Sequence, residues 1–293
     1  MYDVIHIELL SNILSQALAT SIAIEKIQRI GGGSISQTYK VRTTDNNYFI
    51  KVNNDINSEL MFKAEANGLN LLRENSSFNI PKVASVVSDK SASYLVMSFI
   101  ESSGRSSKYW NVLGEKLAAL HKNSNKKFGL HETNFIGSLP QQNDFEDDWP
   151  SFFANRRIIP MVEMAVNEGL VAKSFVTRVD SVLNKIVALM PNEKPALVHG
   201  DLWSGNLIVD AQGQPCLVDP AVYYGHREMD IAFSHLFGGF DREFYESYQE
   251  VFPMDPGFDE RIDLYNLYPL LVHLNLFGRS YLVQVENILA RFT

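Results

Sequence analysis

The chain has 293 residues and a net charge of −8 at pH 7; 45% of its residues are hydrophobic and 20% are charged. This composition is typical of a soluble globular protein and excludes the fibrous and the intrinsically disordered classes. The negative charge gives no overall field that would attract a phosphate backbone, so it disfavours general nucleic-acid binding. At roughly 150 residues per domain, the length fits two domains.

The single cysteine and the lack of long apolar runs indicate a cytoplasmic protein. Cys216 cannot form a disulfide within the chain, which fits a reducing compartment, and we expect it to be a small buried side chain. No Lys or Arg precedes Lys26, so the basic start of a signal peptide is missing. No apolar run approaches the ~18 residues that a membrane-spanning helix needs, so we expect no membrane partner.

The first hundred residues are predicted to form a small sheet with helices. Apolar residues at spacings of three and four predict one helix over 6–19 and another over 59–73. Short apolar stretches bounded by turn-forming residues predict five antiparallel strands: 25–30, 38–42, 48–52, 83–87 and 94–100. A sheet of about five strands is a common size.

The pattern changes after Glu101, because residues 102–104 have the composition of a hinge and most of the remaining sequence has helical spacing. Helices are predicted around 110–120 and 175–189, whereas 196–218 is predicted to be a strand, a loop and a second strand. We therefore expect an α+β protein of two domains. Residues 1–101 would form a small β-sheet lobe with a helix, and 102–293 a larger, mostly helical lobe.

The strongest motif is the run His-Gly-Asp-Leu-Trp-Ser-Gly-Asn over 199–206, followed by Leu-Val-Asp over 217–219. Phosphoryl transfer from ATP needs a carboxylate near the acceptor hydroxyl and oxygen ligands for Mg²⁺. Asp201 and Asn206 have the spacing of the kinase catalytic loop, and Asp219 matches the metal-binding aspartate. The pattern predicts Asp201 as the base and Asn206 and Asp219 as metal ligands. An isolated Asp and Asn would more often cap a turn, and the upstream residues reverse that interpretation.

Lys51 stands inside a predicted apolar strand, where a lysine facing an apolar core would be costly without a partner. It resembles the kinase lysine that pairs with ATP phosphates and with a glutamate on the next helix. Glu65 shares a helical stripe with Leu69 and Leu72 and is the predicted partner, because that stripe would face inward. Glu59 is an alternative that periodicity does not exclude. Lys51 could also be an edge-strand charge that blocks aggregation.

A glycine run, Gly-Gly-Gly-Ser over 31–34, separates two predicted strands. Backbone amides unobstructed by side chains could lie over the phosphates, which makes Gly32, Gly33 and Ser34 candidates for nucleotide binding. A tight hairpin turn explains the run equally well. The run lacks the Gly-Lys-Ser/Thr ending of a Walker loop, which argues against that class of NTPase.

Two departures favour a small-molecule kinase over a protein kinase. Gly200 stands where protein kinases have the arginine of His-Arg-Asp, so the ligand for an activation-loop phosphate is missing. Pro220 and Ala221 follow Asp219 where protein kinases have Phe-Gly, and the proline is expected to bias Asp219 toward an extended backbone. No Ala-Pro-Glu run follows, so no peptide-docking segment is expected.

Over nearly its whole length the chain resembles the fructosamine kinases, or ketosamine-3-kinases. They are a branch of the protein-kinase-like fold shared with aminoglycoside phosphotransferases and choline kinases. The resemblance rests on the run 199–206, on Asp-Pro-Ala-Val-Tyr-Tyr-Gly-His-Arg-Glu-Met-Asp at 219–230, on Thr-Asn-Phe-Ile-Gly-Ser-Leu-Pro-Gln at 133–141, on Asp-Trp at 148–149 with Arg-Arg at 156–157, and on Tyr-Pro-Leu-Leu-Val-His-Leu-Asn at 268–275.

The resemblance implies phosphorylation of the sugar 3-hydroxyl of ketosamines, which leads to their deglycation. ATP and Mg²⁺ would be the cofactors, and the ketosamine would be a small molecule or a protein-bound adduct. Residues 1–101 would bind the nucleotide, and 102–293 would carry catalysis and bind the substrate. Carried over by position, Asp201 is the general base, Asn206 and Asp219 hold Mg²⁺, and Lys51 contacts phosphate.

Further roles follow from the same resemblance. Met97, Ser98 and Phe99 would form the adenine-binding hinge, unless they are simply a strand. Trp203 would form a wall for the sugar or fill the core. The run 226–228, which is His226, Arg227 and Glu228, would contact the substrate or form an ion-paired helix start. Asp230 and His199 are expected to brace the catalytic loop.

The acidic residues Asp144, Glu146, Asp147 and Asp148 could attract a cationic amine, although a solvated loop is the simpler interpretation. Two other functions stay open from the sequence. The chain could phosphorylate another small alcohol, as aminoglycoside and choline kinases do, or it could be a nucleotide-binding pseudokinase. The pseudokinase would be expected to lack the lysine, the base or a metal ligand, and none is lost here.

Overall fold

The computed structural model describes residues 7–31 and 35–292, which divide into two compact units. The first holds the chain up to Glu74, Phe78–Ser106 and Ile208–Asp219, and the second holds Asn75–Ser77, Ser107–Leu207 and the chain from Pro220 onward. The sequence placed one boundary near residue 101. In this division, residues 102–106 and 208–219 lie with the first unit, because the chain returns to it after the catalytic loop.

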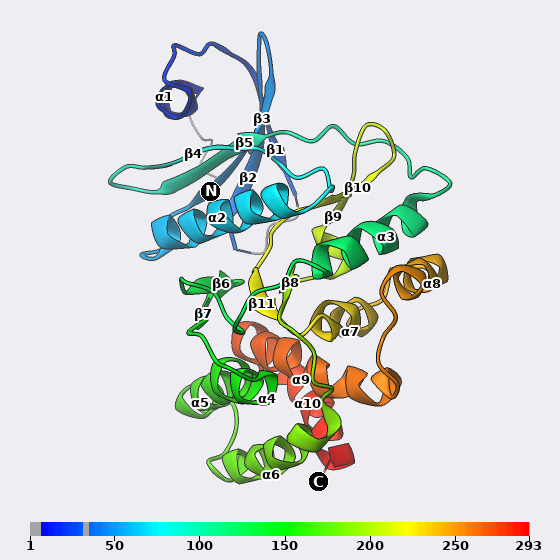
Figure 1. Ribbon diagram of the computed structural model, residues 1–293. Coiled ribbons are helices and arrows are strands. Elements are labelled where there is room, and N and C mark those ends of the chain that lie inside the picture. The colour runs from blue at the N-terminus through cyan, green and yellow to red at the C-terminus, as the bar shows by residue number, and fades with distance from the viewer. Residues whose placement is uncertain (1–6, 32–34, 293) are drawn as a thin grey trace. The chain divides into compact units, whose positions relative to one another are not determined.

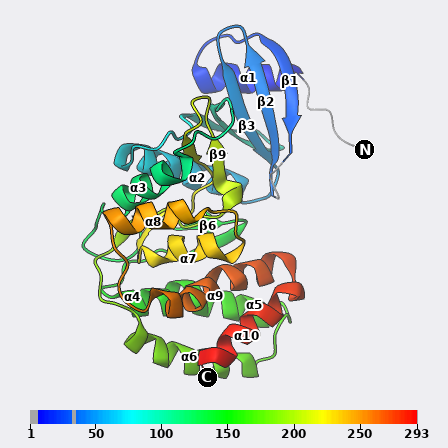
Figure 2. The same cartoon turned by 90° about the vertical axis from the view of Figure 1, so that its right-hand side faces the viewer.

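The first unit is built on a five-stranded antiparallel sheet in the order β1-β2-β3-β5-β4 (Figures 1 and 2). Its strands are β1 (Ile24–Ile30), β2 (Gln37–Thr43), β3 (Asn47–Asn53), β4 (Val83–Ser88) and β5 (Ser93–Ser98). The predicted antiparallel sheet is therefore confirmed. Consecutive strand residues point to opposite faces, so in β3 Ile50 and Lys51 face different sides of the sheet.

The predicted helices of this unit are also present. Helix α1 (Ile7–Leu18) buries Leu10, Ile13 and Leu14, whose spacing of three and one places them on one face. These residues pack with Ile50 and other apolar residues of the sheet. Helix α2 (Ser58–Asn75) lies on the side to which Lys51 points, as the ion pair of Lys51 with Glu65 requires.

The segment 196–218 differs from the predicted strand, loop and strand. Strand β8 (Ala196–Val198) pairs with β11 (Tyr223–Gly225), whereas β9 (Leu207–Val209) pairs with β10 (Pro215–Leu217). A run of three apolar residues does not indicate which strand it pairs with, so periodicity could not predict these two pairings. The β9–β10 hairpin belongs largely to the first unit, where Cys216 is fully buried as expected.

The second unit is mainly helical, as predicted. Its helices are α3 (Tyr109–His121), α4 (Trp149–Phe152), α5 (Ile159–Asn167), α6 (Ser174–Leu189), α7 (Glu228–Leu236), α8 (Arg242–Val251), α9 (Phe258–Phe277) and α10 (Leu282–Phe292). Two features were not predicted: a hairpin of β6 (Asn134–Ile136) with β7 (Leu139–Gln141), and a π-helical turn over Phe153–Ile158. Helix α9 packs against α5, α7 and α10, as Figure 2 shows.

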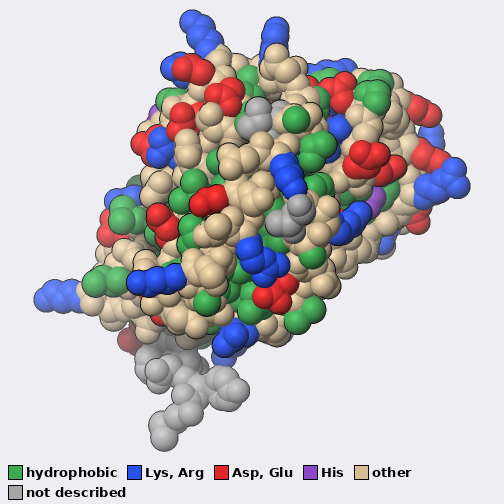
Figure 3. Space-filling model, turned by 90° about the horizontal axis from the view of Figure 1, so that it is seen from below, with side chains coloured by type: hydrophobic (Ala, Val, Ile, Leu, Met, Phe, Trp, Pro, Cys, Tyr) green, Lys and Arg blue, Asp and Glu red, His purple; other side chains and the backbone are tan. Residues whose placement is uncertain are grey.

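Charged side chains of both signs are interspersed on the face shown in Figure 3.

Within 7–31 and 35–292, no helix combines the length and the hydropathy that crossing a lipid bilayer requires.

Candidate active site

In the first unit, Lys51 forms ion pairs with two carboxylates. Its Nζ lies 2.8 Å from Glu65 Oε1 and 2.7 Å from Asp219 Oδ1. Glu65 is therefore the partner, whereas Glu59 pairs with Lys63 on the exposed side of α2. Burial opposes the charge of Lys51, but the two carboxylates outweigh it and raise the pKa of Lys51. The side chain is a buried cation in contact with the predicted metal ligand, and the edge-strand alternative is wrong because β3 lies between β2 and β5.

Asp219 has a left-handed backbone with φ of 53°, not the extended backbone that Pro220 led us to expect. Asp is one of the few residues besides Gly that occupy this region with tolerable strain, because its short side chain can hydrogen-bond locally. Strained backbone of this kind persists where the surroundings over-determine it, which happens at functional sites. The Asp219 side chain is 47% exposed, so its carboxylate remains accessible to a ligand while it contacts Lys51.

In the second unit, Asp201 and Asn206 are joined directly. Asn206 Nδ2 donates to Asp201 Oδ2 at 2.8 Å and to the Asp201 carbonyl at 2.9 Å. These bonds close the loop over a short 3₁₀ turn, Ser204–Asn206, that leads into β9. Because Asn206 uses its amide nitrogen for Asp201, its amide oxygen points elsewhere. Asp201 and Asn206 are therefore bonded to each other and do not act as two separate turn caps.

The buried carboxylate of Asp230 holds the start of the catalytic loop. It accepts hydrogen bonds from the His199 amide at 2.7 Å, the Gly200 amide at 2.9 Å and His121 Nε2 at 3.1 Å. Burial opposes the charge, but these donors outweigh it and lower the pKa of Asp230. The structure thus gives Asp230 the bracing contacts that were expected. His199 Nδ1 in turn accepts from the Asp201 amide at 3.3 Å.

Trp203 lies within the loop and is 38% exposed, so it is not a buried core residue. Its ring packs edge-on against Phe237, with 6.3 Å between centroids. A Cβ at Gly205 would lie 2.2 Å from the ring, so the indole rests directly on that glycine. Part of the indole is therefore exposed, and its role as a wall for the sugar stays a prediction.

The other nucleotide-binding candidates have less support from the structure. Gly32, Gly33 and Ser34 lie outside the described residues. Met97 is buried at the end of β5, and the amides of Ser98 and Phe99 donate to the carbonyls of Lys82 and Asn47. Any adenine contact at 98 or 99 would therefore have to use groups other than these two amides. The hinge stays a prediction.

Asp219 in the first unit and Asn206 in the second unit each carry an oxygen donor of the kind that Mg²⁺ accepts. Mg²⁺ in nucleotide sites is held by one or two carboxylates together with substrate phosphates, and it retains waters. The partly exposed carboxylate of Asp219 and the amide oxygen of Asn206 are donors of this kind. In the part of the chain that the structure describes, no three His, Cys, Asp or Glu side chains gather as a protein-only metal cage would require.

Comparison with known proteins decides the family, because the model of the fructosamine kinase family matches residues 6–293. The chain belongs to the fructosamine kinase family. It is 38% identical over 273 residues to a protein of Enterococcus faecium described as a ketoamine kinase, covering 91% of this chain and 95% of that protein. It is 37% identical to a chloroplastic protein-ribulosamine 3-kinase of rice, covering 94% of this chain and 81% of that protein.

Solved structures agree with this membership in the fructosamine kinase family. A protein from Haemophilus somnus described as a fructosamine-3-kinase has a TM-score of 0.88 at 28% identity, covering 97% of this chain and 96% of that chain. The aminoglycoside phosphotransferase APH(4)-Ia has a TM-score of 0.63 at 15% identity, covering 97% of this chain and 98% of that chain, which shows a shared fold. The predicted family, kinase-like fold and phosphotransferase class are confirmed.

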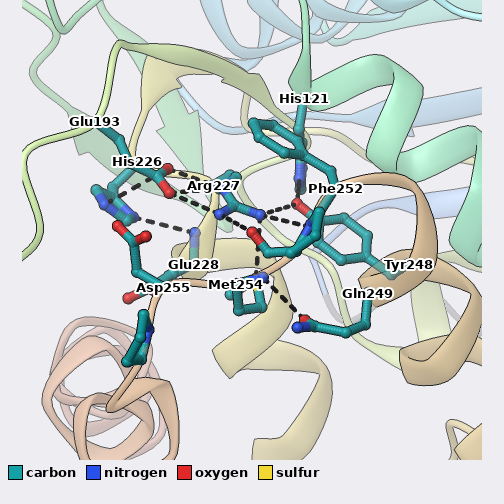
Figure 4. Close-up of polar contacts among 12 residues, drawn as sticks. His121, Glu193, His226, Arg227, Glu228, Tyr248, Gln249, Phe252, Met254 and Asp255 are labelled. Carbon is teal, nitrogen blue, oxygen red and sulfur yellow. Dashed lines mark hydrogen bonds and ion pairs between the residues drawn. The ribbon is translucent and has the colours of Figure 1, made fainter.

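The run 226–228 is buried in this member of the fructosamine kinase family, and its Arg and Glu form ion pairs with residues outside the run (Figure 4). Arg227 donates three hydrogen bonds to the Glu193 carboxylate, at 2.6, 2.8 and 3.0 Å, and one to the Phe252 carbonyl at 2.8 Å. Glu228 pairs with Arg261 at 2.5 Å. These contacts favour the ion-paired helix start, and no contact among the described residues supports a substrate role.

The acidic residues at 144–148 are likewise neutralised within the second unit. Asp144 and Glu146 pair with Arg156 at 3.1 and 2.9 Å. Asp147 pairs with Lys127, and Asp148 caps α4 by accepting from the Ser151 amide. The structure therefore favours local ion pairs and a helix cap over an amine-attracting patch.

Two residues with buried polar partners in the second unit were not predicted from the sequence. His121 ends α3 and joins Asp230 to the hydroxyl of Tyr248, 2.8 Å from His121 Nδ1. Its position at the end of a predicted helix gave no indication of a partner more than a hundred residues away. Glu193, which pairs with Arg227, lies in a short segment between elements where periodicity carries no information.

The two glutamates of α2 give a matched test of the Lys51 site. Replacing the partly buried Glu65 by Gln should lower kcat/KM for MgATP by about 10–100-fold, because Lys51 would lose one of the carboxylates that orient it. Glu59→Gln removes the same charge from an exposed pair and should leave kcat/KM unchanged. Steady-state ADP release at varied ATP measures both. Equal losses in the two variants would contradict the assignment.

Acid should destabilise the protein through His226. Burial lowers the pKa of His226 to about 4, from 6.5, so it stays neutral in the folded protein while the unfolded chain binds a proton. The free energy of unfolding therefore falls as the pH drops from about 6.5 toward about 4. Between about pH 7.5 and about pH 5, this residue should contribute a loss of about 2 kcal/mol.

Urea unfolding of His226→Gln at the two pH values measures this contribution. The variant starts from lower stability, because it loses the stacking of His226 on Tyr265, but its stability should fall less with acid than that of the unmodified protein. His131→Gln, which changes an exposed histidine, is the control and should keep the original pH dependence. An unaltered pH dependence in His226→Gln would exclude this residue as the cause.

Proposed function

We propose that this protein transfers the γ-phosphoryl group of ATP to the 3-hydroxyl of a ketosamine. The observation that carries the proposal is the hydrogen-bonded pair of Asp201 and Asn206, in a chain that matches the fructosamine kinase family over 6–293. This pair supplies a carboxylate for the acceptor hydroxyl and an amide oxygen for a metal from one loop.

In the proposed reaction, Asp201 accepts the proton of the sugar 3-hydroxyl. The hydroxyl oxygen forms a bond to the γ-phosphorus while the bond from that phosphorus to the oxygen bridging the β- and γ-phosphates breaks, and ADP leaves with that bond's electrons. Lys51 contacts the phosphates, and Asn206 and Asp219 would hold Mg²⁺. The ion, when bound, neutralises charge on the phosphate oxygens. The Asn206–Asp201 bond orients the base in advance of the substrate.

The acceptor is proposed to be a fructosyl- or ribulosyl-amine, free or attached to a protein. The names of the relatives support both sugars and, in the rice protein, a protein-bound substrate. We further propose that the phosphorylated product releases its amine, so that the activity reverses glycation. A cytoplasmic location stays a prediction.

An ADP-release assay across a panel of acceptors tests the function. Fructosyl-lysine and ribulosyl-lysine should stimulate ADP release from MgATP, and phosphate should be found on the 3-hydroxyl of the product. Choline and an aminoglycoside serve as acceptors for the alternative kinases. A preference for either of these would reject the ketosamine assignment, and MgATP binding without ADP release on any acceptor would favour a pseudokinase.

Replacing Asp201 by Asn should lower kcat by about 10²–10⁴-fold, because the variant has no carboxylate to accept the hydroxyl proton. Binding of MgATP, measured by calorimetry, should change little. Asp180→Asn removes the same charge from an exposed position on α6 and is the control for kcat. Full activity in Asp201→Asn would refute Asp201 as the base.

A further inference from the structure

Three sequence motifs of the second unit have no part in the proposed reaction. They lie at 133–141, at 156–157 and at 268–275. Each contributes a polar side chain that is almost fully buried: Asn134 at 3%, Gln141 at 1%, Arg157 at 0% and Tyr268 at 2% exposure. Buried polar groups are costly unless they are hydrogen-bonded, so their partners indicate what they do.

The three side chains Tyr268, Gln141 and Asn134 form one hydrogen-bonded chain. The Tyr268 hydroxyl donates to Gln141 Oε1 at 2.7 Å, and Gln141 Nε2 donates to Asn134 Oδ1 at 2.8 Å. Gln141 Nε2 also donates to the Ala221 carbonyl at 3.1 Å, and Asn134 Nδ2 donates to the Val222 carbonyl at 2.7 Å. Two of these three side chains therefore hydrogen-bond to the carbonyls of two consecutive residues, Ala221 and Val222, which follow shortly after Asp219 in the sequence.

Arg157 extends this network from the π-helical turn. Its Nη2 donates to Asn143 Oδ1 at 2.7 Å, and Asn143 Nδ2 donates to Asn134 Oδ1 at 2.8 Å. Its guanidinium lies over the ring of Tyr223, 4.0 Å from the centroid. An arginine stays charged in proteins, so this position keeps a full positive charge in the interior, bound to neutral amide oxygens and an aromatic face.

The backbone of Ala221 lies directly against that of His199 and Gly200, the residues that precede the proposed base Asp201. The Ala221 amide donates to the His199 carbonyl at 2.9 Å. A Cβ built on Gly200 would lie 2.1 Å from the Ala221 carbonyl oxygen, which is the oxygen that Gln141 binds. Asp201 follows Gly200 in the chain. A displacement of Ala221 would therefore move the backbone from which the Asp201 side chain projects.

We propose that Tyr268, Gln141, Asn134 and Arg157 are positioning residues for Asp201, which they fix through the backbone of Ala221 and Val222. This rests on the proposed function of Asp201 as the base. The hydrogen bonds of this buried network reach the carbonyls of Ala221 and Val222, so its effect on the base passes through that backbone. A misplacement of about 1 Å in a catalytic group can lower turnover by about 100-fold.

The protonation of Tyr268 is consistent with its role as a donor. Burial raises the pKa of Tyr268, and the nearby carboxylate of Asp201 raises it further against the effect of Arg157. The hydroxyl therefore keeps its proton and donates to Gln141 over the whole working range of pH. The Arg157 guanidinium lies 5.5 Å from the centroid of the Tyr268 ring.

The test compares two Tyr→Phe changes on helix α9. Tyr268→Phe removes the hydroxyl that holds Gln141, while Tyr265→Phe makes the same change at an equally buried position whose hydroxyl is outside the network. Fructosyl-lysine and MgATP are the substrates. Because lost folding would also reduce turnover, kcat is expressed per nucleotide-binding site counted by calorimetry.

Tyr268→Phe should lower kcat per binding site by about 10-fold while KM for ATP stays within about twofold, and Tyr265→Phe should match the unmodified protein. Gln141→Met, which removes both bonds that Gln141 donates, should lower kcat by about 100-fold. Adding Tyr268→Phe to it should cost nothing more, because both act through Gln141. Gln141→Met alone tests the network if Tyr268→Phe folds poorly, because it leaves Tyr268 unchanged.

Some outcomes would overturn the proposal. One is a kcat per site in Tyr268→Phe that is unchanged or falls no further than in Tyr265→Phe. Another is a fall in the number of nucleotide-binding sites that accounts for all of the lost turnover. A third is a double variant in which the losses of kcat from the two substitutions add. Failure of the unmodified protein to phosphorylate any ketosamine would instead reject the proposed function, so the two failures are distinguishable.

Discussion

The catalytic loop depends on one buried carboxylate that receives three donors. Asp230 accepts from the amides of His199 and Gly200 and from His121, and its charge is stabilised in the interior only because these donors surround it. Removing any donor would leave a buried charge under-solvated, so the loop has little freedom to adopt another shape. The hydrogen bonds between Asn206 and Asp201 then close the other end of the same loop. Asp201, the proposed base, is therefore held by contacts within the protein itself.

The first unit holds its own functional groups by a different means, an ion-pair triad. Lys51 lies between Glu65 and Asp219, so one buried cation has two carboxylate partners. In the proposed reaction, a phosphate of ATP binds Lys51 and a cation binds Asp219, and each of these contacts replaces part of the ion pair between the two residues. The strained backbone of Asp219 fits this role, since strain is retained where a precise side-chain direction is needed.

Much of the fold could be predicted because its signals are local. Alternation and turn residues located the five strands, and the inward stripe of Glu65, Leu69 and Leu72 selected the partner of Lys51. The features that could not be predicted depend on contacts between residues far apart in the sequence. The pairing of β8 with β11 and the bond of His121 to Asp230 join segments that no periodicity connects. The φ of Asp219 was predicted wrongly because the local preference before a proline yields here to its surroundings, which include Lys51.

The glycine at position 200 limits which kinds of regulation this scaffold can acquire. Its φ is +82°, and the Ala221 carbonyl oxygen occupies the place where a Cβ would be. Protein kinases carry an arginine at the matching position, where it senses a phosphate on a distant loop. Restoring that arginine here would force apart two backbone segments before it could reach any phosphate. A single substitution at this position is therefore not a route to control by a phosphate on another segment.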